Sequence, residues 1–242
     1  MRLALAAALL IAAAPALADS ALIAVATNFR PVAEILAGNY AAVSGNTVEI
    51  SAGATAKLAQ QIGAGAPFDA FLSADAATPT RLAGEGAADP ATQFTYATGR
   101  LALWTAAGGA DLTDPAGALT AARHVAIANP EVAPYGKAAM ETIGTLGLSG
   151  LGSKLVMGEN IGQTQTLVAS GAAEIGFVAA SGLVGAGGTS WLVPQEAHSP
   201  IRQDAILLIH GTGNAAATGF LAYLRSEAAR QVIEDYGYAA AP

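Results

Sequence analysis

Apolar and polar positions along the chain follow two different periods. Short runs rich in Val, Ile, Leu and Phe predict strands at residues 21–26, 47–51, 68–73, 101–105, 124–128, 154–157, 174–178 and 205–210. Between these runs, apolar residues recur at steps of three and four, which predicts helices. This spacing is clearest at Val32, Ile35, Leu36, Tyr40 and Val43. Strands that alternate with helices indicate an α/β fold with mainly parallel sheets.

The chain also shows signs of two lobes. Extended stretches at residues 96–104 and 201–208 are each long enough to pass from one lobe to another. We therefore expect lobe one to contain residues 20–97 with 200–242, and lobe two to contain residues 98–199. The longest helical pattern runs from about Ala215 to Tyr236 and is expected to stop at Gly237, because glycine commonly follows the last helical turn.

Four predicted strands lead almost directly into a helix through small or hydroxyl side chains. In open α/β sheets, ligands bind outside the carboxyl ends of the strands, where helix N-termini offer free N–H groups to anions. One such turn alone is explained by helix capping, since Thr and Asn are good caps. The recurrence favours a site for a small oxyanion, formed by turns at Thr27-Asn28, Gly53-Ala54-Thr55, Tyr135-Gly136 and Asn160-Ile161-Gly162.

The first 18 residues predict an exported protein. Arg2, an apolar run and the small-residue pattern Ala16-Leu17-Ala18 are typical of a secretory signal that is removed after about Ala18, and the run is too short for an ordinary membrane span. The chain has no Cys, so an exported form relies on its core instead of disulfides. Its net charge of −7 argues against nucleic acid as a partner.

Sequence motifs for catalysis or for a resident metal are missing. The three histidines, His124, His198 and His210, lie far apart and lack metal-ligand spacing, and neither a G-x-S-x-G motif nor a P-loop occurs. Asp69 and Asp75 could suggest paired carboxylates, but their surroundings predict a buried strand that ends in a turn cap. We therefore expect neither an enzyme nor a cofactor.

Three long stretches resemble the periplasmic substrate-binding proteins of molybdate ABC importers. They are "LAQQIGAGAPFDAFLSAD" (58–75), "NPEVAPYGKAAMETIGTLG" (129–147) and "FLAYLRSEAARQVIEDYGY" (220–238), and the resemblance covers nearly the whole chain after the signal. It implies a two-lobe, type II-like periplasmic-binding-protein fold with the ligand in the cleft between lobes. It also implies a periplasmic monomer that captures molybdate or tungstate and delivers it to a membrane permease.

The same resemblance implies which residues hold the oxyanion. In this family, hydroxyls and backbone N–H groups at the helix starts bind the anion without a counter-charge. Many members add a Tyr at the position of Ala179, and we expect the phenol of Tyr135 to replace it, or only the Tyr135 N–H to bind. Lys57 and Lys137 are expected to face solvent. The predicted ligand-binding residues are Thr27, Asn28, Thr55, Tyr135 and Ile161.

The identity of the ligand stays open at the level of sequence. Molybdate and tungstate are nearly equal in size and charge, and sulfate has the same shape and charge as both. A binding protein of the same fold for another small anion, such as sulfate, is therefore the alternative. Ferric ion would need a cluster of Tyr, His and carboxylate ligands, for which one Tyr near the cleft is thin support.

Overall fold

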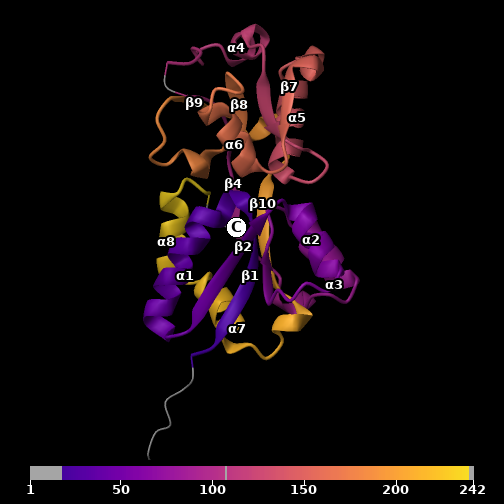
Figure 1. Cartoon of the computed structure of the whole chain (residues 1–242), viewed down its shortest axis with the longest axis vertical. Helices are drawn as coiled ribbons and strands as arrows, with labels where there is room; N and C mark the ends of the chain where they lie inside the picture. The colour runs from indigo at the N-terminus through magenta and orange to yellow at the C-terminus, as the bar shows by residue number, and fades with distance from the viewer. Residues whose placement is uncertain (1–17, 107, 240–242) are drawn as a thin grey trace, which may run out of the picture.

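The computed structural model describes residues 18–106 and 108–239, so almost all of the predicted signal lies outside the described residues. The chain forms two α/β lobes that follow one another along the long axis of the molecule (Figure 1), each built on a five-stranded sheet. In order across the first sheet, the strands are β2 (Thr47–Gly53), β1 (Ser20–Ala26), β3 (Ala70–Leu72), β10 (Ile201–Leu207) and β4 (Phe94–Gly99). In order across the second, they are β7 (Leu155–Gly158), β6 (Val125–Ala128), β8 (Ile175–Ala179), β5 (Leu101–Thr105) and β9 (Thr189–Leu192).

Helices cover both faces of each sheet, because successive strand residues point to opposite faces and both sets are apolar. The first sheet packs on one face against α1 (Arg30–Ser44), α7 (Ala215–Tyr223) and α8 (Glu227–Asp235), and on the other against α2 (Thr55–Gly63) and α3 (Ala77–Gly84). The second sheet packs against α4 (Pro115–Ala121) and α5 (Pro134–Thr145), and against α6 (Ile161–Ala169) on its other face.

Short 3₁₀ helices complete the connections in the described ranges. They are η1 (Thr27–Phe29), η2 (Pro90–Thr92), η3 (Ser149–Lys154), η4 (Ala180–Leu183), η5 (Gln195–Ala197) and η6 (Ile209–Gly211). Across residues 18–106 and 108–239, none of the helices is both long enough and apolar enough to cross a bilayer.

The sheets are mixed, so the expectation of mainly parallel sheets was wrong in that detail. Strand β1 runs parallel to β2 and β3, and β6 runs parallel to β7 and β8. Strand β10 is antiparallel to β3 and β4, and β5 is antiparallel to β8 and β9. The reason is the route of the chain: β5 follows β4 of the other sheet directly, and β10 returns from the second sheet. Neither strand is entered through the helical crossover that connects parallel neighbours.

The single long helix expected from about Ala215 to Tyr236 is two helices, α7 and α8, which corrects that prediction. Ser226 lies between them with an extended backbone, and its Oγ accepts a hydrogen bond of 3.2 Å from the N–H of Ala229, so it caps α8. Apolar spacing alone hides this break, because both helices bury one face against the same core. The predicted stop at Gly237 is confirmed, with a left-handed φ of 78°.

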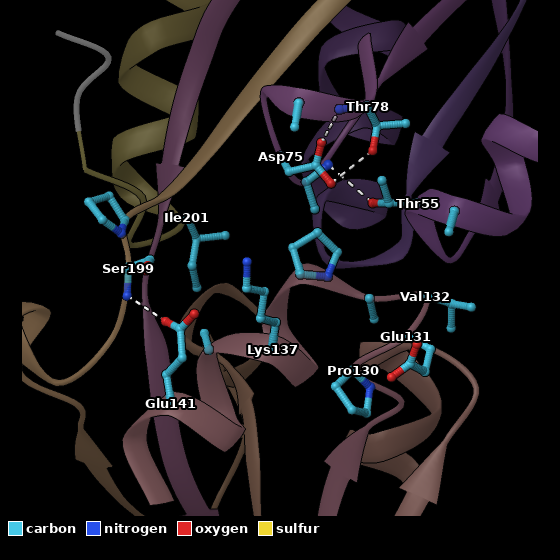
Figure 2. Close-up of a pocket in the computed structure, with 17 residues that line it drawn as sticks. Thr55, Asp75, Thr78, Pro130, Glu131, Val132, Lys137, Glu141, Ser199 and Ile201 are labelled. Atoms are coloured by element: carbon cyan, nitrogen blue, oxygen red, sulfur yellow. Dashed lines mark hydrogen bonds between the residues drawn. The ribbon is translucent and has the colours of Figure 1, made fainter. Parts of the chain in front are cut away.

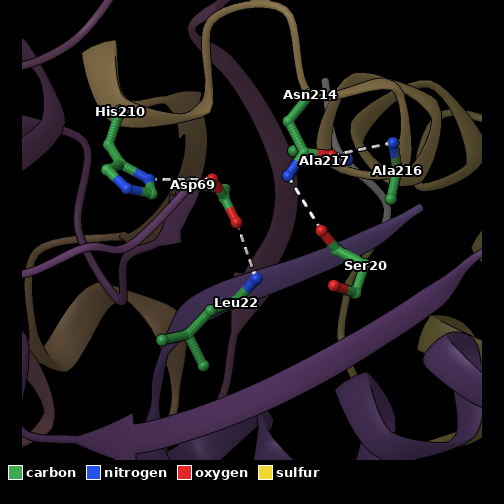
Figure 3. Close-up of polar contacts among 7 residues, drawn as sticks. All are labelled: Ser20, Leu22, Asp69, His210, Asn214, Ala216 and Ala217. Carbon is green, nitrogen blue, oxygen red and sulfur yellow. Dashed lines mark hydrogen bonds and ion pairs between the residues drawn. The ribbon is translucent and has the colours of Figure 1, made fainter.

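Asp69 and Asp75 hold local structure separately, as the sequence predicts. Asp69 Oδ2 accepts from the Leu22 N–H at 2.8 Å, and its Oδ1 lies 2.9 Å from Nδ1 of His210 (Figure 3). Asp75 Oδ1 accepts from the Thr78 N–H at 2.7 Å, at the turn into α3. The chain passes between the sheets at Gly99–Leu101 and before Ile201. The residue limits of the two lobes given above stay a prediction.

Candidate functional site

The four turns singled out in the sequence lie at the carboxyl ends of two pairs of parallel strands. Strand register places Ala26 at the end of β1 beside Gly53 of β2, and Ala128 of β6 beside Gly158 of β7. Because the paired strands end level with each other, the turns that follow them lie side by side. They lead into η1 and α2 in the first lobe and into α5 and α6 in the second.

These turns surround a small space between the lobes. All five predicted ligand-binding residues line it, so the fold brings them together from both lobes. Its lining contains no charged side chain: Ala26, Thr27, Asn28, Gly53, Ala54, Thr55, Ala74, Ala133, Pro134, Tyr135, Asn160 and Ile161. An anion in this space would be held by hydrogen bonds and helix dipoles alone.

Thr27 carries an unpartnered hydroxyl at this space. Its Oγ1 is buried and forms no hydrogen bond, and among the described residues it is the one buried side-chain nitrogen or oxygen atom without a partner. A buried hydroxyl without a partner costs free energy, so this group is poised for an acceptor supplied from outside the chain. Gly162 of the second lobe lies close by: a Cβ on it would come within 2.6 Å of the Thr27 methyl carbon.

Thr55 lies on the other strand end of the first lobe and is almost fully buried. Its Oγ1 accepts a hydrogen bond of 3.3 Å from the N–H of Ala74, which leaves the hydroxyl hydrogen to donate. Thr55 is also the first residue of α2, so its N–H has no acceptor within the helix. One residue thus offers two donors to the space.

The side-chain amide of Asn28 is used inside the protein, so it is not a donor for the ligand. Its Nδ2 donates to Gln203 Oε1 at 2.8 Å and to Tyr238 Oη at 3.1 Å, so both amide hydrogens point into the protein. Its carbonyl accepts from Tyr238 Oη at 2.8 Å. What remains for a ligand is the N–H of Asn28, in the first turn of η1.

Tyr135 and Ile161 bring the helix starts of the second lobe to the space. Tyr135 is the second residue of α5 and Ile161 the first of α6, so their N–H groups lack acceptors within their helices. The Asn160 side chain caps α6 by accepting from the Gln163 N–H at 3.0 Å, which leaves the N–H of Ile161 unused by the cap. The phenol of Tyr135 accepts from Gln203 Nε2 at 3.1 Å, and its burial raises its pKa well above the usual value, so it stays neutral.

A larger hollow of about 280 Å³ opens beside the small space and shares Thr55, Ala74, Ala133 and Pro134 with it. Figure 2 shows Asp75, Glu131 and Glu141 around it, with Lys137 between the lobes. Three carboxylates against one ammonium make this hollow unfavourable for a resident anion. The smaller neutral space is therefore the better anion site.

The two lobes also touch at the rim of the site. The Ala56 N–H donates to the Val132 carbonyl at 3.1 Å, and Lys57 Nζ lies 2.9 Å from Glu159 Oε2. Lys57 therefore pairs with a carboxylate of the other lobe, and its side chain remains about half exposed. Among the described residues, no group of three His, Asp or Glu side chains is placed to hold a metal ion.

The polar residues behind the site were missed by the sequence reasoning. Gln203 is fully buried in β10, and Tyr96 and Tyr238 are almost fully buried beside it. The available signal was weak: Gln203 lies between Arg202 and Asp204, just before the apolar run "AILLI". A polar residue in a buried strand must find partners, but the sequence does not name them.

Comparison with known proteins gives a consistent result. The family model described as "Bacterial extracellular solute-binding protein" matches residues 21–239. The chain is 44% identical to the molybdate-binding protein ModA of Rhodobacter capsulatus, over 93% of this chain and 90% of that protein. It is 42% identical to molybdate-binding protein ModA of Azotobacter vinelandii, over 89% and 88%. The solved periplasmic molybdate-binding protein of Azotobacter vinelandii superposes with a TM-score of 0.85 at 33% identity, covering 92% of this chain and 100% of that structure.

Proposed function

The chain belongs to the family of bacterial extracellular solute-binding proteins, and we propose that it captures molybdate or tungstate and delivers the oxyanion to the permease of an ABC importer. It acts as a binding protein and not as an enzyme. The observation that carries the proposal is the neutral space at four strand ends, into which the unpartnered Thr27 hydroxyl is buried. The identity to two molybdate-binding proteins over most of the chain supports the same ligand.

Each predicted residue has a defined role in this proposal. Thr27 and Thr55 donate through their hydroxyls, and Asn28, Thr55, Tyr135 and Ile161 donate through their N–H groups. The ligand carries two negative charges, whereas the whole chain carries a net charge of −7, so long-range attraction does not hold it. Neutral donors become strong when the lobes close over the anion and water leaves, because the local dielectric falls.

The proposal also covers the limits of the lobes, the oligomeric state and the location of the protein. Lobe one comprises residues 20–97 with 200–242 and lobe two residues 98–199, and the anion lies between them. The protein works as a monomer in the periplasm, after removal of a signal that ends at about Ala18. It has no nucleic-acid partner, and its metal enters only as part of the oxyanion cargo.

A thermal-shift panel on the protein without its signal tests the ligand. A ligand that binds only the folded state at a hundredfold excess over Kd stabilises it by about 2.7 kcal/mol. For a chain of this size that raises Tm by about 5–11 °C. Molybdate and tungstate should both do so at low micromolar concentration, because they fill the same space.

Other solutes serve as controls in the same panel. Sulfate should do little, since it is too small to reach all the donors together, and phosphate at neutral pH brings a proton for which a donor-only site has no acceptor. Ferric ion should give no shift. A large shift with sulfate and none with molybdate would replace the ligand but keep the anion site. No shift with any oxyanion would overturn both.

A further inference from the structure

Gln203 occupies a central position behind the candidate site. It is fully buried on β10, next to a shift in register between Gln203 and Asp204. Its Oε1 accepts from Asn28 Nδ2 at 2.8 Å, and its Nε2 donates to Tyr135 Oη at 3.1 Å. The Tyr96 hydroxyl lies 3.0 Å from Gln203 Oε1 and 3.0 Å from the Ser73 carbonyl, so its one hydrogen is shared between these acceptors. One carboxamide is therefore bonded to two residues of the first lobe and one of the second.

The bond between Gln203 and Tyr135 crosses from one lobe to the other. Strand β10 belongs to the first sheet, whereas Tyr135 is the second residue of α5, which packs in the core of the second lobe. Gly99 leaves the space for this bond: a Cβ there would lie 2.2 Å from Tyr135 Oη and 2.6 Å from Gln203 Nε2. Any residue larger than glycine at position 99 would therefore collide with both partners of the bond.

The same carboxamide fixes the orientation of Asn28. The other Asn28 amide hydrogen goes to Tyr238 Oη, and Tyr238 returns its hydrogen to the Asn28 carbonyl at 2.8 Å. Burial raises the pKa of the phenols of Tyr96, Tyr135 and Tyr238, so the cluster around Gln203 stays neutral. Because the Asn28 side chain is held in this way, the direction of its N–H toward the site is held as well.

We propose that Gln203 is a positioning residue that couples the two halves of the anion site, through Asn28 in the first lobe and Tyr135 in the second. This inference rests on the proposed function. Gln203 does not touch the anion. Its bond to Tyr135 joins the lobes in the arrangement in which all four turns line one space.

This role predicts a particular effect of the Tyr135 phenol. If the phenol acts through Gln203, its removal weakens anion binding only while Gln203 is present. If the phenol instead donates directly to the anion, its removal weakens binding whether or not Gln203 is present. The two mechanisms are therefore separated by a double-mutant cycle of Gln203→Met and Tyr135→Phe.

The cycle is measured by calorimetry with sodium molybdate and by thermal unfolding without it. With Gln203 present, Tyr135→Phe should raise Kd about 3- to 10-fold, the range of one net hydrogen bond. In the Gln203→Met background it should raise Kd by less than about twofold. Because the two side chains are bonded in the structure, their changes in Tm should be less than additive. A bond that acted on stability alone would leave Kd unchanged, so the coupling in Kd is the readout of the positioning role.

A matched control is Gln93→Met. Gln93 Nε2 donates to Asp204 Oδ2, the neighbour of Gln203, at 2.8 Å and to Thr80 Oγ1 at 3.0 Å, both in the first lobe. Its loss should lower Tm without changing Kd. If Gln203→Met does not fold by circular dichroism, Gln203→Asn, which withdraws the carboxamide by one methylene, takes its place in the cycle.

The outcomes separate this inference from the proposed function. Wild-type protein that fails to bind molybdate overturns the proposed function, and this inference with it. Wild-type binding with equal effects of Tyr135→Phe in both backgrounds overturns the positioning role of Gln203 and leaves the proposed function standing. Wild-type binding with the effect confined to the Gln203 background supports both.

Discussion

The two threonines at the site differ in whether their hydroxyl groups form a hydrogen bond within the protein. Thr27 Oγ1 is buried without a partner in the described ranges, whereas Thr55 Oγ1 already accepts from the Ala74 N–H. Only the second hydroxyl contributes a hydrogen bond to the ligand-free protein. Their removal should therefore have the same effect on binding and opposite effects on stability.

Thr27→Val keeps the shape of the side chain and removes the hydroxyl. Anion affinity should fall by about 10- to 150-fold, the range of a hydrogen bond of about 1.5–3 kcal/mol to a charged group. Tm of the ligand-free protein should stay the same or rise, because a buried unsatisfied group is lost. Calorimetry and thermal unfolding measure the two effects, with Thr27→Ser as the variant that keeps the donor. A fall in ligand-free Tm with unchanged affinity would make Thr27 a structural residue.

Thr55→Val should lower affinity over the same range but also destabilise the ligand-free protein. The N–H of Ala74 loses its acceptor, which for a buried donor costs about 1–3 kcal/mol and lowers Tm by about 2–12 °C. The same two measurements apply. A change in affinity of less than twofold would leave Thr55 only a structural role at the start of α2.

The sequence predicted which residues line the site, but it did not predict which donor group of each residue faces the ligand. The turns predicted at Thr27, Thr55, Tyr135 and Ile161 all line one space. The inward use of the Asn28 side chain could not be predicted, because its partners Gln203 and Tyr238 lie 175 and 210 residues away in the chain. Local pattern identifies a residue at a helix start, but only the fold decides which of its donors faces the ligand.

At the scale of elements, the residue that caps α6 also lines the candidate anion site. Asn160 lines the space and caps α6 through its Oδ1. Asn and Asp are about equally good caps, so Asn160→Asp should leave Tm of the ligand-free protein within about 2 °C. The added negative charge beside a dianion should lower affinity about tenfold or more.

The cap and the charge can be separated by a second variant. Asn160→Ser keeps a capping oxygen without charge, so it should keep both Tm and most of the affinity. If Asn160→Asp binds molybdate as tightly as the wild type, the anion does not occupy the space that Asn160 lines.

Several of the elements that the sequence missed have no strong local period. Helices α3 and α4 span 8 and 7 residues and strand β9 spans 4, which is too short for a clear repeat. The split between α7 and α8 depends on one capping Ser in an otherwise continuous apolar pattern. By contrast, β5 was predicted with its observed bounds, because a short run of five apolar or β-branched residues is typical of a buried strand.

Strand β6 is tied to the residue before β8 by a carboxylate whose charge depends on pH. Glu174 Oε2 accepts from the His124 N–H at 2.8 Å, and Oε1 lies 2.9 Å from Nε of Arg123. The His124 N–H chiefly, with Arg123, holds the pKa of Glu174 below its ordinary value of 4.5. A lowered pKa in the folded state gives stability that is present above the unfolded pKa and is lost as pH falls through the folded one.

Glu174→Gln should therefore lower Tm most at neutral pH. The difference from the wild type should shrink as the pH falls below 4.5 and should disappear once the pH lies below the lowered pKa of the folded state, because the carboxyl is then protonated in both states. Thermal unfolding across this range measures it, and Glu196→Gln in η5 serves as a surface control. A difference that is constant with pH would mean that the shape of Glu174 matters and its charge does not.

At the scale of the whole molecule, the lobes meet through few polar contacts around a small space. The Ala56–Val132 backbone bond and the Lys57–Glu159 pair lie at its rim, and the Gln203–Tyr135 bond lies behind it. The Ser181 hydroxyl of η4 also reaches the Asn28 carbonyl, at 3.3 Å. The division into two lobes followed from the extended stretches in the sequence, whereas these contacts depend on how the lobes meet.

The Lys57–Glu159 pair tests whether a rim contact contributes to anion capture. Both side chains are about half exposed or more, so the pair contributes little and should change Kd by at most roughly fivefold. Glu159→Gln alone also removes a negative charge near the anion, so the pair is isolated by a double-mutant cycle with Lys57→Met. The coupling energy for molybdate binding should be favourable in 20 mM salt and should largely disappear in 0.5 M NaCl, because exposed charges are screened.

The Arg81–Glu85 pair of α3 is the control, since both of its residues lie in one lobe and Glu85→Gln should leave Kd unchanged. A coupling that persists in high salt, or an equal effect at Glu85, would show that Lys57 and Glu159 do not act as a contact between the lobes.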